Sequence, residues 1–294
     1  TQLQSSAASD VYKRQIGNWE KGILPPTAPL PIASATTTGV ALAASRLGVS
    51  RFHLAPVGEG CSSSGEFWEA MNFAGVRGLP ICFMIQNNQI ALDTLNSAQS
   101  GAETFGDKGH AMGIPAWTID GSDPALFYAS TAVAKEFATD GCGATLIHVE
   151  TMRGCGHAHH HDDLYLGASS GNPPGYVDRE LLRYWSEKDP LPNHRQLLNK
   201  LGVGEQKLNR IQMEEEGKVE SARRQLEKME WPEGNSVVKG VTSISDAPSH
   251  EKQLRRIDGA GAISSTSLDS GELSIEFSDA VSYTHLRAHE TAYY

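Results

Sequence analysis

A carboxylate between two glycines and a later pair of asparagines are the residues best suited to hold a metal and a phosphate. Glu59 lies within Gly58–Gly60, and residues 61–86 separate that turn from Asn87 and Asn88. Carboxylate and amide oxygens are hard ligands, and one of each leaves positions on Mg²⁺ or Ca²⁺ for a polyphosphate. The glycines would let the backbone approach that phosphate, and the N-terminus of a following helix favours an anion.

The second cluster with chemical potential is the run RGCGHAHHHDDLY, residues 153–165. Its composition suggests zinc or nickel, but a metal site needs ligands that converge on one point. Consecutive histidines point in different directions in an extended chain, so all of them cannot bind one ion. We interpret the run as a polar loop at the mouth of a site, ordered by Asp162, Asp163 and one histidine. A dedicated metal site and the roles of His159–His161 stay open.

Alternating helices and strands must position these two clusters. Apolar runs of strand length occupy residues 51–58, 79–86, 114–120 and 143–150, and helical patterns occupy residues 31–48, 64–78 and 123–139. This alternation predicts an α/β fold, with a doubly wound, mostly parallel sheet and helices on both faces. Ligands bind at the carboxyl ends of the strands in such sheets, so both clusters should meet at one edge. The middle helix should begin after Ser64 as its N-cap and stop at Gly78.

The chain beyond Asp178 has a different character. Two short helices should be followed by a charged helix from about Gly204 to Glu230, which Pro232 ends. Apolar residues recur along that helix near one stripe, so it should pack by one face. The members of the stripe are Leu208, Ile211, Val219, Ala222, Leu226 and Met229.

Composition excludes several classes of protein. The formal net charge of −10 argues against a nucleic-acid surface, which would require a basic stripe. The sequence lacks an apolar run of about 18 residues and a signal-peptide pattern, so no membrane span is expected. The 4 cysteines are scattered without a CxxC pair, as in reduced cytoplasmic proteins. We therefore expect a cytoplasmic location, or the mitochondrial matrix if the source is eukaryotic.

Four stretches stand in the same order as in a known enzyme family. They are ILPPTAPLPIASATTTGVALA, GEGCSSSGEFWEAMNFAG, LPICFMIQNNQIALDT and VETMRGCGHAHHHDD, within residues 22–201. With them the sequence resembles the α subunit of the decarboxylating component of 2-oxo acid dehydrogenases, of the branched-chain or pyruvate type. The Gly-acid-Gly turn followed by Asn-Asn is that family's thiamine diphosphate signature. Glu at position 59 resembles the branched-chain enzymes.

The resemblance implies thiamine diphosphate and Mg²⁺ as cofactors, and it assigns roles to individual residues. The metal ligands it implies are Glu59, the side chain of Asn88 and the backbone carbonyl of Ile90. Gly60 and Cys61 would contact the diphosphate, and Ala28 and Leu30 would line the middle of the cofactor. Gln86 stands where branched-chain relatives have an arginine that contacts phosphate, so that contact is left open.

His157 matches the family histidine that lies beside the diphosphate and the reacting carbon. The resemblance makes it the catalytic residue of this chain, an acid and base for proton transfer. Ala158 follows where relatives regulated by phosphorylation have serine, so that control should be absent. The implied reaction is oxidative decarboxylation of a small 2-oxo acid, with transfer of the acyl group to a lipoyl-bearing acyltransferase.

The same resemblance implies an oligomer with a β subunit, which supplies the glutamate that activates the cofactor. Residues 272–280 resemble the start of such a β chain, so a fused β half is the other form this partner could take. Two alternatives stay open. One is a transketolase-like thiamine diphosphate carboligase, and the other is a non-enzymatic, histidine-rich metal-binding module.

Domain boundaries follow from these patterns. Residues 1–15 and 281–294 resemble translated sequencing-adapter reads and fit no neighbouring element. Residues 16–231 should form the thiamine diphosphate-binding domain, without its N-terminal part. Residues 232–271 are rich in Ser, Gly, Asp and Lys and read as a flexible linker. A fragment of this kind, without the β half, should be inactive alone.

Overall fold

The computed structural model describes residues 17–18, 21–24, 29–158, 161–168, 171 and 174–231. The expectations for residues 1–15, 232–271, 272–280 and 281–294, and for Ala28, His159 and His160, lie outside these residues. The chain divides into a unit that ends at Leu208 and a second unit from Asn209.

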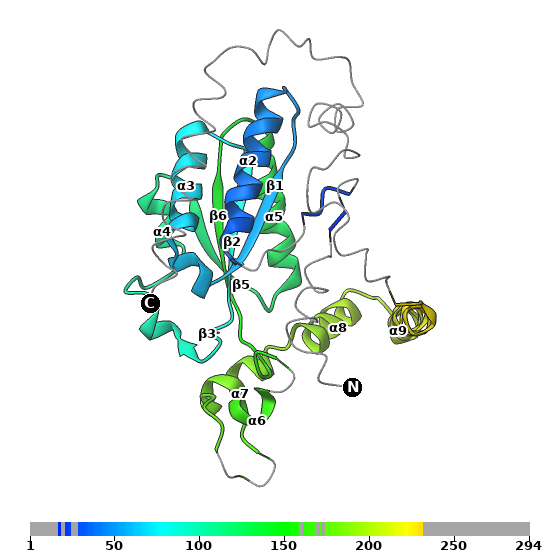
Figure 1. Cartoon of the computed structure of the whole chain (residues 1–294). Helices are drawn as coiled ribbons and strands as arrows, with labels where there is room; N and C mark the ends of the chain where they lie inside the picture. Colours follow the sequence, from blue (N-terminus) through cyan, green and yellow to red (C-terminus); the bar gives the residue numbers. More distant parts are fainter. Residues whose placement is uncertain are drawn as a thin grey trace. The chain divides into compact units, whose positions relative to one another are not determined.

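Four parallel strands form the sheet of the first unit, in the order β1-β2-β6-β5 (Figure 1). Their bounds are His53–Gly58 for β1, Ile81–Asn87 for β2, Ala116–Asp120 for β5 and Thr145–Glu150 for β6. The two central strands, β2 and β6, are buried along nearly their whole length, as expected for strands covered on both faces. The α/β fold class predicted from the sequence is confirmed.

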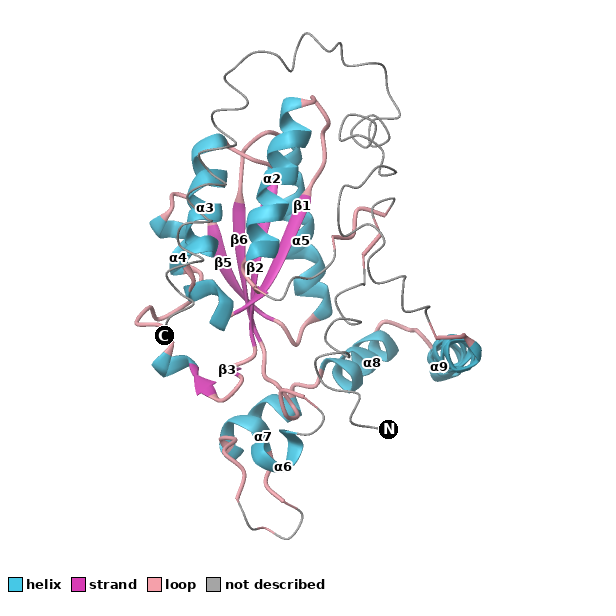
Figure 2. Cartoon of the chain, in the orientation of Figure 1, coloured by secondary structure: helices cyan, strands magenta, loops and turns pink. Residues whose placement is uncertain are grey.

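Helices cover both faces of this sheet (Figure 2). Helices α2 (Ile32–Arg46) and α3 (Gly65–Arg77) share one core with Phe83 and Ile85 of β2. Helix α5 (Pro124–Thr139) packs on the other face, where its buried residues meet those that alternate with the first set along β2 and β6. Side chains of β2 thus alternate between the core under α2 and α3 and the core under α5.

Helix α3 has the predicted ends, although the side chain of its N-cap residue does not cap the helix. Gly78 follows the helix with φ 59°, a left-handed conformation that glycine adopts without strain. Ser64 occupies the N-cap position, yet its hydroxyl donates a 3.0 Å hydrogen bond to the Cys61 carbonyl instead of capping the helix. The hydroxyl is turned back because a 3₁₀ turn, η1 (Gly60–Ser63), precedes the helix.

Several short elements lie between the predicted ones. They are the hairpin strands β3 (Ile90–Ala91) and β4 (Thr94–Leu95), the 3₁₀ turn η2 (Asn96–Ala98), and the helices α4 (Asp107–Ala111) and α6 (Asp162–Tyr165). Elements of this length show no hydrophobic period, so the sequence did not predict them. They matter for function because β3, β4 and η2 directly follow Asn88.

The later helices agree with the sequence. Helices α7 (Arg179–Glu187) and α8 (Pro190–Lys200) are the two short ones, and α9 (Glu205–Lys228) is the charged one. Leu208 is the buried member of the apolar stripe of α9 among the described residues. Val219 and Leu226 of the same stripe are 71% and 69% exposed. The packing expected for that face is therefore not seen in the described part of the chain. No described helix combines the length and apolar character needed to cross a membrane.

Candidate functional site

The carboxyl ends of three adjacent strands meet at one edge of the sheet. Parallel pairing sets Gly58 beside Gln86 and Asn87 beside Glu150. The segment after β6 then follows the turn after β2, because Thr151 N donates to Asn87 O (2.9 Å) and Arg153 N donates to Asn88 O (3.2 Å). The expected convergence at this edge is confirmed for Glu59, Asn88 and the first residues of the histidine loop.

Glu59 is a buried carboxylate with one unsatisfied oxygen. It is 1% exposed, and its Oε2 accepts a 3.3 Å hydrogen bond from Asn88 N. Its Oε1 is buried and has no hydrogen-bond partner among the residues that the structure describes. A buried carboxylate oxygen without a hydrogen-bond donor or a cation raises the free energy of the folded state, so a cation bound at this atom would be stabilising.

The oxygens around Glu59 suit a hard divalent cation. Asn88 Oδ1 accepts a 3.3 Å hydrogen bond from Ile90 N, so the amide oxygen lies within the turn that also carries the Ile90 carbonyl. A carboxylate, an amide and a carbonyl are ligands that Mg²⁺ accepts, with other positions left for phosphate and water. Among the described residues no group of three or more His, Cys, Asp or Glu could hold a metal. The three oxygen ligands of the turn are of the kind that Mg²⁺ prefers, whereas zinc and nickel favour nitrogen and sulfur.

The turn between these ligands is strained and firmly held. Gln89 has φ 77°, which a non-glycine residue adopts only when its surroundings enforce it. Its Nε2 donates to Glu150 Oε2 (2.7 Å) and to Thr151 O (3.0 Å). Its Oε1 accepts from Asn96 Nδ2 (3.1 Å). Neighbouring β6 and η2 thus fix the backbone between Asn88 and Ile90.

The two glycines beside Glu59 have different surroundings. A Cβ at Gly60 would lie 2.6 Å from Ala91 Cβ, so β3 packing alone requires glycine there. A Cβ at Gly58 would meet nothing within 4 Å. Cys61, after them, is half-buried, and this burial raises the pKa of its thiol. The space in the direction of a Cβ is therefore open at Gly58 and filled by Ala91 at Gly60.

A buried lysine supports the turn after Gly60, and sequence reasoning missed it. Lys108 of α4 is 5% exposed, and its Nζ donates to the carbonyl (2.9 Å) and the hydroxyl (2.8 Å) of Ser62. Ser62 Oγ in turn donates to Glu59 O at 2.6 Å. The ammonium lies 4.8 Å from the centre of the Phe105 ring, and burial lowers the pKa of Lys108 to about 8. Lysines are mostly exposed, so no signal in the sequence pointed to this one.

His148 is a second buried group that the sequence did not reveal. It lies in the middle of β6 with no exposed surface, and its Nδ1 is 3.1 Å from Thr118 Oγ1. Burial lowers the pKa of His148, against the opposite influence of the Glu150 and Asp107 carboxylates. Its position inside an apolar strand pattern made it look like a core residue.

The predicted residues outside the turn are on the surface. His157 is exposed, and its ring is stacked 6.4 Å from that of His161. Leu30 is 61% exposed. The contacts described for these residues do not include Glu59 or Asn88. Asp162 does order the loop as expected, because its Oδ1 accepts a 2.7 Å hydrogen bond from Gly156 N.

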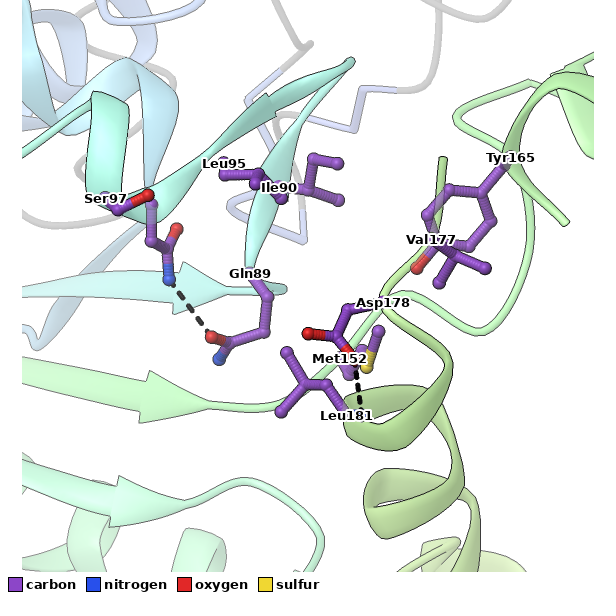
Figure 3. Close-up of a pocket in the computed structure, with 10 residues that line it drawn as sticks. Gln89, Ile90, Leu95, Ser97, Met152, Tyr165, Val177, Asp178 and Leu181 are labelled. Carbon is purple, nitrogen blue, oxygen red and sulfur yellow. Dashed lines mark hydrogen bonds between the residues drawn. The ribbon is translucent and has the colours of Figure 1, made fainter. Parts of the chain in front are cut away.

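A pocket of about 200 Å³ adjoins the Asn88–Ile90 turn (Figure 3). The hairpin side supplies Gln89 and Ile90, while the segments after β6 supply Tyr165 and Leu181 across from them. Its complete lining is Gln89, Ile90, Leu95, Asn96, Ser97, Met152, Tyr165, Val177, Asp178 and Leu181. Most of these side chains are apolar, so the pocket suits hydrocarbon rather than phosphate.

Comparison with known proteins identifies relatives of this chain. The family model described as the dehydrogenase E1 component matches residues 3–233. That match includes part of segment 1–15, whose separate origin stays a prediction.

Three relatives are all named pyruvate dehydrogenase E1 component subunit alpha. The Bacillus subtilis protein is 38% identical over 183 residues, which are 62% of this chain and 45% of that protein. The Bacillus cereus protein is 36% identical over 179 residues, 61% and 46% of the two chains. The Staphylococcus epidermidis protein (strain RP62A) is 33% identical over 211 residues, 71% and 53% of the two chains. This chain spans about half the length of these curated relatives.

A solved chain described as a thiamin diphosphate-dependent enzyme isolated from Mycobacterium smegmatis overlaps with part of the fold. It is 21% identical with a TM-score of 0.34, over 41% of this chain and 22% of the other. A likeness of that size decides nothing about function.

Proposed function

Because the chain belongs to the dehydrogenase E1 component family, we propose that it is part of the decarboxylating component of a 2-oxo acid dehydrogenase. In this proposal it binds thiamine diphosphate through Mg²⁺. The observation that carries the proposal is the buried Glu59 carboxylate, whose Oε1 has no partner among the described residues, beside the Asn88 side chain and the Ile90 carbonyl.

In this proposal each residue of the turn has a separate task. Glu59, Asn88 and Ile90 supply the carboxylate, amide and carbonyl oxygens that hold Mg²⁺. Gly60 and Cys61 offer backbone to the diphosphate, and the open space at Gly58 supports a close approach there. Leu30 and Ala28 line the middle of the cofactor. Thiamine diphosphate, when bound, supplies the electron sink that decarboxylation of a 2-oxo acid requires.

His157 is the proposed acid and base for transfer of the acyl group. Imidazole suits proton transfer near neutral pH, and the exposed ring of His157 is open to a partner's lipoyl group. Gly156 N is tied to Asp162 Oδ1, so the residue before the histidine is fixed by the loop itself. The loop's ordering by an aspartate supports a role in placing one histidine.

We further propose the partners and the substrate class. A β subunit or fused β half would complete the active site, and a lipoyl-bearing acyltransferase would accept the acyl group from the cytoplasmic or matrix enzyme. The substrate is a small 2-oxo acid. The three relatives carry the name of pyruvate dehydrogenase, whereas Glu at position 59 favours a branched-chain acid.

The test uses the complete protein together with its β partner. We expect release of CO₂ from pyruvate or 3-methyl-2-oxobutanoate with an artificial electron acceptor, dependent on both thiamine diphosphate and Mg²⁺. Transfer of a two-carbon unit between sugar phosphates, without 2-oxo acid decarboxylation, would replace this proposal with a carboligase. Stoichiometric zinc binding that persists in the Glu59→Ala variant, without cofactor binding, would replace it with a metal-binding module.

A further inference from the structure

Glu150 contacts both neighbours of the proposed ligand Asn88. It ends β6, beside β2, and its Oε2 accepts hydrogen bonds from Asn87 Nδ2 (3.0 Å) and Gln89 Nε2 (2.7 Å). Hydrogen bonds to a carboxylate are stronger than those between neutral groups. One oxygen of Glu150 therefore binds the residues before and after Asn88, and the hydrogen bonds described for it do not include Asn88 itself.

The backbone of the turn is strained at Gln89 and needs hydrogen bonds that stabilise it. Left-handed conformations are unfavourable for non-glycine residues, and Gln89 with φ 77° is in this region. The Gln89 side chain offsets that cost through Glu150, Thr151 O and Asn96. Of these three partners, Glu150 supplies the charge-assisted bond.

The second oxygen of Glu150 is directed toward the interior of the sheet. Its Oε1 lies 3.1 Å from Nε2 of the buried His148, although not in the alignment of a full hydrogen bond. On its other side His148 contacts Thr118 of β5 through Nδ1 at 3.1 Å. His148 of β6 and Thr118 of β5 thus lie behind the Glu150 carboxylate and limit its rotation.

We infer that Glu150 is a positioning residue for the metal centre: through Asn87 and Gln89 it holds the Asn88 amide oxygen and the Ile90 carbonyl in the geometry that the cation requires. This inference rests on the proposed function, and Glu150 itself touches neither metal nor substrate. Mg²⁺ demands near-ideal octahedral geometry, so small displacements of its ligands weaken binding. Loss of a residue that orients metal ligands typically weakens metal affinity by about 10- to 100-fold.

The experiment compares Glu150→Gln with Glu136→Gln, which removes an exposed carboxylate of α5. Glutamine keeps the size of Glu150 but removes its charge, so its amide oxygen accepts hydrogen bonds from Asn87 and Gln89 more weakly than the carboxylate does. In the complete protein with its partner, Mg²⁺ affinity is measured by calorimetry at saturating thiamine diphosphate. We expect Glu150→Gln to weaken Mg²⁺ binding by about 10- to 100-fold, and high Mg²⁺ to restore activity. Glu136→Gln should leave the affinity unchanged.

A second variant separates positioning from general stability. Glycine adopts a positive φ without strain, so Gln89→Gly removes both the strain and the side chain that Glu150 holds. The loss of Mg²⁺ affinity caused by Glu150→Gln should therefore be smaller in the Gln89→Gly background than in the wild type. Equal losses in both backgrounds would overturn the inference, even if Glu150→Gln alone lowers stability.

Failure of this inference differs from failure of the proposed function. If Glu150→Gln leaves Mg²⁺ affinity within twofold while Glu59→Gln abolishes binding, Glu150 has no positioning role and the metal centre stands. If Glu59→Gln also leaves Mg²⁺ affinity unchanged, the metal centre itself is wrong, and the role of Glu150 falls with it.

Discussion

The backbone N–H of Asn88 donates to Oε2 of Glu59 at 3.3 Å, while Oε1 of the same carboxylate is buried without a partner in the described part of the chain. Two residues far apart in sequence are joined because β1 and β2 are parallel neighbours, whose carboxyl ends meet at one edge. The described residues thus satisfy one oxygen of Glu59, and the other is the oxygen that we propose binds a cation. A fully satisfied carboxylate would have indicated a structural role instead.

The glycines beside Glu59 should respond differently to alanine. Gly60→Ala places a Cβ 2.6 Å from Ala91 Cβ, so β3 must shift, and we expect a loss of about 1–3 kcal/mol in the free energy of unfolding. The Cβ of Gly58→Ala would lie in open space, so this substitution should change the free energy of unfolding by no more than about 0.5 kcal/mol. Urea unfolding of both variants measures the difference. Equal losses would contradict the packing described for Gly60.

A surface leucine in the β3–β4 hairpin should be replaceable with a gain in stability. Leu92 has φ 55° and is 48% exposed, so it bears left-handed strain with little burial in return. Asparagine tolerates this conformation better, and Leu92→Asn should raise the free energy of unfolding by about 0.5–1 kcal/mol. The control is Leu95→Asn, at a similarly exposed leucine with φ −66°, which should bring no gain. Equal effects of both substitutions would show that backbone strain at Leu92 is not the cause.

Lys108 should make stability depend on pH in the alkaline range. Burial lowers its pKa from 10.5 to about 8, so between these values the unfolded chain retains a proton that the folded chain has released. Stability contributed by this residue therefore rises with pH, by at most about 1.4 kcal/mol per pH unit. The free energy of unfolding of the wild type, minus that of Lys108→Met, should increase from pH 8 to pH 10.

The control for that prediction is Lys135→Met, at an exposed lysine of α5. The corresponding difference for this variant should stay flat over the same pH range. A flat or falling difference for Lys108→Met would mean that the folded protein does not disfavour the charged amine.

The sequence predicts the sheet, and the edge at which Glu59 and Asn88 meet, for physical reasons. β2 and β6 are continuous apolar runs because both of their faces are covered, and such runs are visible without a structure. Strand ends in a parallel sheet converge, so the neighbourhood of Glu59 and Asn88 followed from the order of elements. The ends of α3 also followed from local rules, since Gly78 is the residue type that stops a helix.

The remaining parts of the site depend on contacts that no local pattern encodes. The left-handed Gln89 is held by side chains from β6 and η2, and Glu150 was expected only as the end of a strand. Lys108 comes from a five-residue helix without a detectable period. Composition drew attention to the histidine run, but the family resemblance singled out His157, and its role stays a prediction.

The most direct test of the account is the Glu59→Gln variant of the complete protein, with two measurements. Glutamine replaces a buried carboxylate whose Oε1 has no partner among the described residues. We therefore predict that, without metal, the free energy of unfolding of the variant is equal to or higher than that of the wild type. Calorimetric titration with Mg²⁺ in the presence of thiamine diphosphate should then show no binding to the variant and saturable binding to the wild type. Undiminished Mg²⁺-dependent cofactor binding by Glu59→Gln would contradict the central claim that this carboxylate holds the metal.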